Sequence, residues 1–387
     1  MLPNIKFNIS TTGLGRLQAD IQKIPGLIIT GVSVATKVTI GKSYQLFSIE
    51  EAKNLGIDET SNPFAYKHIK HFYDYAGENA ELWVMLVSDA TTMAQMVDKA
   101  GNIATRLIQD AGGKIRILGL IKKSSGTETA LDALDADVNA SVIASQNLAD
   151  YYAGKYYPFR VIISGNNYTG SATDLKDYGQ NNYNRVSILV SNTDGNKEAS
   201  IGLALARIAS IPVQRNIGRV KDGAVEEIQA YFTNGAKVES NSDFWETIHD
   251  KGYIFLRNYV GRAGFFFSDD PTLTKESDDF KSLANGFVMD KAILISYNTL
   301  INELLDEIPV TASGNIHPAI IKSWQTNVET QINGLMIETG ELSGRRVFID
   351  ENQKVLQTGI LNVKIALQPV GYAKYIVVNI GFTTNIE

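Results

Sequence analysis

Short apolar runs alternate with longer amphipathic stretches through the first two thirds of the chain. Runs typical of buried strands lie at 27–34, 82–87, 115–121, 159–164 and 186–190. Stretches of helical composition lie between them, at 64–75, 92–111 and 129–150. Strands that alternate with helices of about ten or more residues indicate βαβ units with parallel pairing, in a sheet covered on both faces. This pattern predicts an α/β domain.

The remainder of the chain has a different pattern. Two long helices are predicted, one over 280–308 and one that begins at Pro318. Strands follow after Gly340, at 346–349 and 359–367. The second helix repeats an apolar residue at every fourth position, which places these side chains on one stripe: Ile320, Trp324, Val328, Ile332 and Met336. This order predicts an α+β unit that differs from the first domain.

Each end of the chain carries a strand pattern set off by glycine or proline. Gly13 and Gly15 follow the first pattern, and Pro369 and Gly371 precede an uncharged segment at 375–382. The apolar residues of these segments, and of the strand before Pro369, are Ile5, Phe7, Ile9, Val363, Ile365, Leu367, Tyr375, Val377, Ile380 and Phe382. Exposed strands of this kind are aggregation hazards and must be paired. Pairing within the same subunit and strand addition to a neighbouring copy both stay open.

Composition narrows the classes of function. Lys and Arg number 36 and Asp and Glu 42, a formal charge of −6, which argues against a general nucleic-acid binder. Cysteine is absent, which excludes disulfides, thiolate catalysis and Cys-ligated zinc. The longest uncharged stretches fall well short of the roughly 20 apolar residues that a membrane-spanning helix needs. We therefore expect neither membrane insertion nor a secretory signal.

Candidate catalytic and metal-binding residues are few. The chain has no GxSxG elbow and no GxxxxGK[ST] phosphate loop, and its early Gly-x-Gly pair lacks the third glycine of a dinucleotide site. His68 and His71 share one face of a predicted helix, which we expect to be solvated, because no third ligand has suitable spacing. An acidic cluster at 269–279 lacks the spacing of a calcium loop, so we expect a solvated loop with a helix N-cap at Ser277. We expect no catalytic residue, cofactor or metal.

Several segments stand in a characteristic order. Near the start, PGLIITGVSVAT is followed by FSIEEAKNLGI, and near the end IHPAIIKSWQTNVETQINGLMIETGELSG precedes TGILNVKIALQPVGYAKYIVV. In this order they resemble the opening strand and helix, the C-terminal helix and turn, and the closing strand and arm of the tail sheath proteins of contractile phages and related injection systems. The residues after Pro369 depart from that family, because many sheaths carry a proline and an acidic residue there.

The resemblance implies a fold class. It is α/β (mixed α+β), with an outer α/β sheet domain, a C-terminal α+β sheath core domain, and strand-exchanging N- and C-terminal arms. The expected division is 1–18 for the N-terminal arm, 19–238 for the α/β part with its variable outer region at about 115–235, 239–368 for the core domain and 369–387 for the C-terminal arm. The expected hinges of the arms are Gly13, Gly15, Pro369 and Gly371.

The resemblance also implies a function. Sheath subunits form hexameric rings that stack helically around a tail tube and contract to drive the tube through a target envelope. The implied partners are further copies of the chain, the tail tube protein, the baseplate and the tail terminator, with no nucleic acid. The implied location is a virion tail or injection-system particle assembled in the bacterial cytoplasm. The C-terminal part lies near the tube in such assemblies, and the stripe expected to face it is Ile320, Trp324, Val328 and Ile332.

Alternatives remain open at this stage. An α/β enzyme that acts on a sugar or nucleotide would show a polar pocket at the carboxyl ends of its parallel strands. A different structural component, such as a tube or baseplate protein, is a third interpretation. Four arginines are either ordinary surface charge or partners in ion pairs across a subunit interface: Arg257, Arg262, Arg345 and Arg346.

Overall fold

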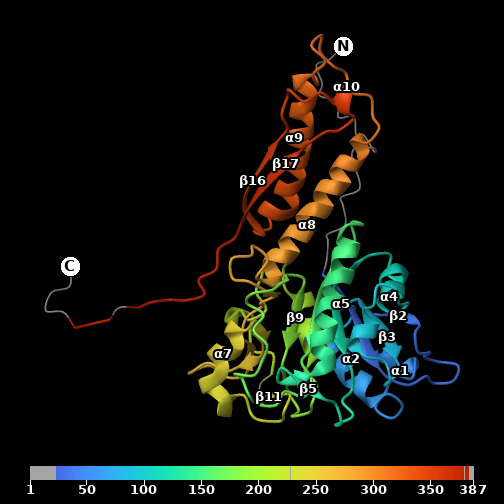
Figure 1. Cartoon of the computed structure of the whole chain (residues 1–387), viewed down its shortest axis with the longest axis vertical. Helices are drawn as coiled ribbons and strands as arrows, with labels where there is room; N and C mark the ends of the chain where they lie inside the picture. The colour runs from blue at the N-terminus through green and yellow to red at the C-terminus, as the bar shows by residue number, and fades with distance from the viewer. Residues whose placement is uncertain (1–22, 227, 379, 383–387) are drawn as a thin grey trace, which may run out of the picture.

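The computed structural model describes residues 23–226, 228–378 and 380–382. It has a broad body, a narrow spike, and a C-terminal segment that runs away from both (Figure 1). The body holds the first two thirds of the chain, and the spike is built from two long helices and a β-hairpin. The mixed α+β fold class expected from the sequence is confirmed.

A seven-stranded sheet forms the centre of the body. In spatial order its strands are β12 (Tyr253–Ile254), β9 (Val186–Leu189), β7 (Arg160–Ser164), β4 (Ile115–Ile121), β1 (Ile24–Thr30), β3 (Leu82–Val87) and β2 (Ser43–Leu46). Neighbouring strands pair in parallel except β2, which is antiparallel to β3. The edge strand β12 lies beyond residue 239, where the sequence placed the start of the second domain, so the sheet of the body extends further along the chain than expected.

Helices cover both faces of this sheet. The chain leaves β1 toward β3 and leaves β4 toward β7, in opposite directions, so right-handed crossovers place their helices on opposite faces. On one face α2 (Pro63–Ala76) packs against α6 (Ile201–Ser210), and α5 (Ala136–Ala153) contacts β7 and β9 on the other. The helices α2 and α6 approach closely, since a Cβ at Gly202 would lie 2.0 Å from the His68 carbonyl oxygen. Glycine is therefore required at position 202.

The spike consists of α8 (Leu283–Leu300), α9 (Pro318–Ile332), β16 (Leu342–Phe348) and β17 (Lys364–Pro369). α9 packs against both α8 and β16, and a π-helical turn at Asn333–Ile337 leads from it toward the hairpin. The helix α8 is shorter than the helix predicted over 280–308. Its N-cap is Ser282 and not the predicted Ser277, because the Ser282 hydroxyl accepts a hydrogen bond from the N–H of Ala284.

Short elements complete the fold. They are α1 (Ile49–Asn54), α3 (Met93–Met96), α4 (Ala104–Asp110), α7 (Trp245–Asp250), α10 (Val355–Thr358), β5 (Ala130–Leu131), β6 (Leu134–Asp135), β8 (Asn182–Tyr183), β10 (Ser191–Asn192), β11 (Tyr231–Phe232), β13 (Leu256–Arg257), β14 (Phe266–Phe267), β15 (Leu273–Thr274) and 3-10 helices at Val220–Asp222, Glu239–Phe244 and Ile301–Glu303. β15 pairs with β8, so the segment just before the spike is tied to the body.

Candidate assembly surfaces

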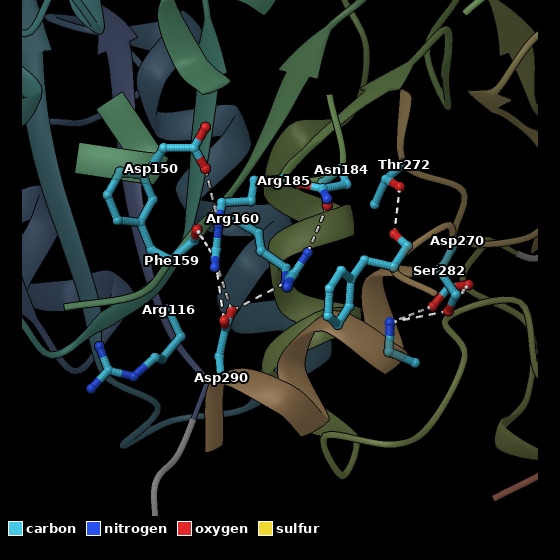
Figure 2. A network of polar contacts seen from close by, with 12 residues as sticks. Arg116, Asp150, Phe159, Arg160, Asn184, Arg185, Asp270, Thr272, Ser282 and Asp290 are labelled. Carbon is cyan, nitrogen blue, oxygen red and sulfur yellow. Dashed lines mark hydrogen bonds and ion pairs between the residues drawn. The ribbon is translucent and has the colours of Figure 1, made fainter. Parts of the chain in front are cut away.

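A buried ion-pair network fixes the spike to the body (Figure 2). Asp290 on α8 lies 3.2 Å from Arg160 Nε on β7 and 3.2 Å from Arg185 Nη1. Gly286, one helical turn earlier, makes room for this contact, because a Cβ there would lie 1.7 Å from the Arg160 guanidinium carbon. Burial lowers the pKa of Arg160 to about 10, while the charge of Asp290 opposes that shift. Two arginines of the body thus share one carboxylate of the spike.

Two adjacent carboxylates are buried where the spike begins. Asp270 accepts hydrogen bonds from the Ser282 hydroxyl at 2.8 Å and the Ala284 N–H at 2.9 Å, so it closes the first turn of α8. The Asn216 amide donates to Asp269 at 2.5 Å and to Asp270 at 2.7 Å. Burial, together with the charge of Asp269, raises the pKa of Asp270. The solvated loop expected at this end of the acidic cluster is therefore wrong, because both carboxylates cap and join the chain's own elements.

Asp269 holds the root of the C-terminal arm. Lys374 Nζ lies 2.8 Å and His249 Nε2 lies 3.1 Å from the same carboxylate oxygen, Oδ2. Burial disfavours the charge of Asp269, but His249 and Lys374 outweigh it and keep the pKa of Asp269 below its ordinary value. The hydrogen bond to Asp269 in turn raises the pKa of His249. We call the contact among Asp269, His249 and Lys374 the arm latch.

Beyond the latch the arm lies open to solvent. Its described residues from Tyr375 onward form neither helix nor strand, and Figure 1 shows them running away from the body. Their apolar side chains are almost fully exposed, at 83% for Tyr375, 85% for Val377, 95% for Ile380 and 111% for Phe382. The structure therefore does not pair this segment within its own subunit, which was one of the two alternatives left open by the sequence.

The other arm residues divide between described and undescribed parts of the chain. Ile5, Phe7, Ile9, Gly13 and Gly15 lie outside the described residues. At the C-terminal end, Pro369 is the last residue of β17, and a Cβ at Gly371, two residues later, would meet no other atom within 4 Å. The predicted hinge thus coincides with the place where the hairpin ends and the arm begins.

β16 and β17 form a two-stranded antiparallel ribbon in the described part of the chain. The strand predicted over 359–367 begins only at Lys364, and its alternation is confirmed there, with Ile365 and Leu367 half-buried toward the core of the spike. Val363, just before the strand, is half-buried as well. Ile365 and Leu367 pair with β16 of their own subunit, so pairing with another copy requires the outer edge of the strand. A two-stranded ribbon is marginally stable in water. This one rests on α9, where Glu329 accepts a hydrogen bond from the Val347 N–H at 3.1 Å.

The apolar stripe of α9 is not a tube-facing surface. Trp324, Val328 and Ile332 are buried in the core of the spike, and Ile320 is half-buried beside them. The Trp324 indole N–H also donates to Glu303 at 2.6 Å. The expectation is wrong because an amphipathic helix buries its apolar stripe against its own neighbours first. The face of α9 that reaches solvent is polar and carries Lys322, Ser323, Thr326, Asn327 and Thr330.

The helix face around His68 is also buried, contrary to expectation. His68 is fully enclosed between α2 and α6, and His71 is largely buried beside it. Burial lowers the pKa of His68 well below its ordinary value. The small residues of α6 allow the two helices to approach so closely that the His68 side chain is shielded from solvent. In the residues that the structure describes, no group of three or more His, Asp or Glu side chains is arranged to hold a metal.

The carboxyl ends of β1 and β4 mark the point where the strand order reverses, which is where α/β enzymes bind ligands. In this protein, polar groups at this point form hydrogen bonds within the chain's own loops. The Lys123 N–H donates to the Thr30 hydroxyl at 3.0 Å, and the Asn62 amide bonds to both the N–H and the carbonyl of Val32, at 2.7 and 3.1 Å. These groups fix loops and are not presented to a ligand.

Comparisons with known proteins show which family this chain belongs to and which solved structures share its fold. The family model described as DUF2586, N-terminal domain, matches residues 2–271, and DUF2586, C-terminal domain, matches residues 279–387. The chain belongs to the DUF2586 family. A search of curated proteins found no match.

Solved structures with a similar fold are subunits of contractile assemblies. The helical sheath of the anti-feeding prophage (AFP) in its contracted state is 13% identical, with a TM-score of 0.64 over 100% of this chain and 99% of that one. The contracted PVC sheath complex of an extracellular contractile injection system is 12% identical, with a TM-score of 0.54 over 100% and 99%. A sheath tail protein from Listeria innocua is 10% identical, with a TM-score of 0.51 over 90% and 95%. The chain has the fold of contractile sheath proteins.

One further observation concerns membranes. Among the helices in the described residues, none is both long enough and apolar enough to cross a bilayer. The longest two, α5 and α8, each carry charged residues within their span, among them Asp150 and Asp290.

Proposed function

We propose that this protein is a structural subunit of a contractile sheath. It polymerises as stacked hexameric rings around a tail tube and contracts to drive the tube through a target envelope. The likeness of the whole chain to sheath proteins of AFP and PVC supports this proposal. Its partners are further copies of itself, the tail tube protein, the baseplate and the tail terminator. The particle is a virion tail or an injection system, assembled in the bacterial cytoplasm.

The observation that carries the proposal is an exposed apolar segment that follows a hairpin with open edges. The segment from Tyr375 to Phe382 has the composition of a buried strand, but the side chains of it that the structure describes lie in solvent. The hairpin of β16 and β17 is a ribbon of two strands with outer edges that a third strand can extend. Each copy therefore both offers a strand and accepts one. Three or four hydrogen bonds at about 0.5–1.5 kcal/mol each make one arm a modest tie, but a polymer repeats it at every subunit.

The arms give the polymer its continuity during contraction. We propose that the N-terminal arm, with Ile5, Phe7 and Ile9 behind Gly13 and Gly15, crosses to a neighbour in the same way. The bodies then rotate as rigid units while the arms stay engaged and bend at Pro369 and Gly371. The free energy is stored at assembly, so no nucleotide is consumed. The body forms the outer layer, with 115–235 as its variable part, and the spike with its hairpin lies closer to the tube.

Catalysis has no part in this proposal. The polar groups at the switch point of the sheet, including Thr30 and Asn62, are hydrogen-bonded within the chain's own loops. The buried charged residues, such as Asp290 and Asp270, join structural elements to one another. A role in mechanical coupling accounts for these contacts.

Deletion of 375–387 tests the proposal and keeps the arm latch intact. The truncated protein is expected to stay folded and soluble, with an unchanged circular dichroism spectrum, because the deleted side chains that the structure describes are exposed. The full chain should form striated hollow cylinders in negative-stain electron microscopy, and the truncated chain should not. A matched control replaces Val377 and Ile380 by threonine, which keeps strand propensity and is expected to shorten the cylinders without abolishing them. Normal cylinders from the truncated chain would refute the arm exchange.

A further inference from the structure

The outer edge of β17 lies within reach of the arm of the same subunit. β17 ends at Pro369, one of its edges pairs with β16, and within the described residues no strand pairs with the other. Only residues 370–374 separate β17 from the uncharged segment that begins at Tyr375. Hairpin loops commonly have roughly two to five residues. This linker therefore has the length to return the arm along the strand that precedes it.

One register of such a hairpin buries apolar side chains. With residues 370–373 as the turn, Ile376 would lie opposite Leu367, and Val378 opposite Ile365. Ile365 and Leu367 are half-buried against the core of the spike, whereas Ile376 and Val378 are 80% and 73% exposed. Side chains that lie opposite each other share one face of a sheet, so closure would bring both arm residues against that core. The pattern of the arm thus suits pairing within the subunit as well as exchange.

Pairing within the subunit has a large advantage in concentration over exchange. A short flexible linker gives an effective concentration of roughly 1 mM, whereas free subunits at about 10 μM offer their arms to one another at roughly a hundredfold less. With the same strand contacts, the closed subunit would then be favoured over exchange by about a hundredfold. A chain that exchanges this strand therefore needs a contact that opposes the turn.

The root of the arm is held on the body and not on the spike. Val370, Tyr372 and Lys374 line an open hollow beside α7, together with Trp245. The Lys374 ammonium lies 2.8 Å from Asp269, a carboxylate whose side chain is only 11% exposed. In Figure 1 the chain continues past the end of β17 toward the body and then runs away from it. The residues that a closing turn requires are thus laid along the body.

We propose that the arm latch determines which copy the arm pairs with. By holding Lys374 on Asp269, the latch prevents residues 370–373 from turning back, so the arm stays available to a second copy. Lys374 is the residue that determines this specificity. His249 and Asn216 bond to the same carboxylate and are positioning residues. The inference rests on the proposed arm exchange and adds what keeps that exchange between subunits.

A disulfide reporter measures closure of the arm, because the chain has no cysteine of its own. Ala366 and Val377 are both exposed and would lie opposite each other in the closed register, at a separation that a disulfide spans. The double variant Ala366→Cys with Val377→Cys is oxidised for a fixed time as dilute, unassembled subunits, and peptide mass spectrometry measures the fraction with an intrachain disulfide. With native Lys374 this fraction should stay low. Adding Lys374→Glu, which repels Asp269, should raise it by about threefold or more.

Two further variants are matched to Lys374→Glu. Lys374→Arg keeps a cation that pairs with Asp269, so the intrachain fraction should stay as low as with lysine. Lys114→Glu makes the same charge change at an exposed lysine of the body and should alter neither closure nor assembly. In the chain without the cysteine pair, Lys374→Glu should leave free subunits where the native chain forms cylinders in negative-stain microscopy, because a closed arm no longer binds a neighbour.

The outcomes separate this inference from the proposed function. If the native chain assembles but Lys374→Glu gives no more intrachain disulfide than native Lys374, the latch does not oppose closure, and the inference is overturned while the sheath function stands. If Lys374→Glu closes the arm and still assembles as fully as the native chain, closure does not compete with exchange, which also overturns it. If the native chain forms no cylinders, the proposed function fails and the inference fails with it. Circular dichroism of each variant confirms that a change in closure or assembly is not a loss of fold.

Discussion

The body and the spike differ in what they leave unpaired. In the body, seven strands pair in one sheet, helices cover its faces, and even the histidine at its closest helix contact is enclosed. In the spike, two strands form a ribbon over one helix, and the arm that follows exposes side chains such as Val377 and Phe382. The body buries its apolar side chains within one chain, whereas the spike leaves the edges of a ribbon open and is followed by an exposed apolar segment.

This difference assigns separate tasks to the two regions. A domain with its hydrogen bonds closed can move as a rigid unit, and a ribbon with open edges can keep contact while units move around it. Under the proposed function the junction between them must be stiff, because motion of the body has to reach the spike. The buried network of Arg160, Arg185 and Asp290 supplies that stiffness.

The largest loss of stability is expected when the ion-pair network at this junction is broken. Asp290→Asn removes the carboxylate that two arginines share and leaves the enclosed Arg160 guanidinium without its counter-charge. Loss of one partner from a buried ion pair costs about 3–5 kcal/mol. We expect the free energy of unfolding, measured in urea, to fall by this amount.

A matched control uses the other carboxylate of the same network. Asp150 lies 3.4 Å from Arg185 Nε, but its side chain is more than half exposed. Asp150→Asn should therefore cost no more than about 1 kcal/mol, as exposed ion pairs do. Equal effects of the two substitutions would show that the network does not join the spike to the body as described.

Much of this architecture could be predicted from the sequence, but its junctions could not. The buried strands were visible because a sheet covered on both faces requires apolar residues at every position, and β17 was visible because one face of it is half-buried. The arm latch joins Lys374 to a residue 105 positions away, and no local pattern encodes such a pairing. One signal was present, since Arg160 interrupts an apolar run in which a lone charge requires a partner. Its partner could not be read in the same way, because Asp290 stands directly beside Lys291.

The stripe of α9 shows a second limit of the sequence. Its spacing revealed that Trp324, Val328 and Ile332 share one face, and the structure confirms that they do. Periodicity states only that such a face is covered, not whether the cover is the same subunit or a partner. Here α8 and the hairpin of the same chain cover this face, so the side chains expected to face a tube are buried although the helix itself was predicted.

A smaller change in stability, dependent on pH, is expected from His68, the enclosed histidine of the body. Burial lowers the pKa of His68, so below about pH 6.5 the unfolded chain binds a proton that the folded protein does not. Stability is then full above that pH and falls as the pH drops, by up to about 1.4 kcal/mol per unit. His68→Asn retains an acceptor for the Gly202 N–H but cannot titrate, so the decline between about pH 7 and pH 5 should be shallower.

Urea unfolding at several pH values measures this decline. His249 contributes with the opposite sign, because Asp269 raises its pKa and its contribution is lost as the pH rises, so only the difference between variant and native protein isolates His68. The control His317→Asn removes an exposed histidine and should leave the native slope unchanged. Identical slopes for the native protein and His68→Asn would mean that the enclosed ring takes up its proton in the folded state.

Loss of the arm latch is expected to have the smallest effect on stability. It should nevertheless separate the arm from the body most clearly, because only the root of the arm should change. Lys374→Gln removes the ion pair with Asp269, and because the lysine is partly exposed the cost in unfolding free energy should be under about 1 kcal/mol. The root of the arm, however, loses its attachment to the body, and hydrogen exchange of residues 371–375 should become faster while exchange in the seven-stranded sheet stays unchanged. Lys364→Gln, on the exposed face of β17, is the matched control and should alter neither. If residues 371–375 of Lys374→Gln exchange as slowly as in the native protein, the charge on Lys374 does not hold the root of the arm. The backbone after Pro369 would then hold it.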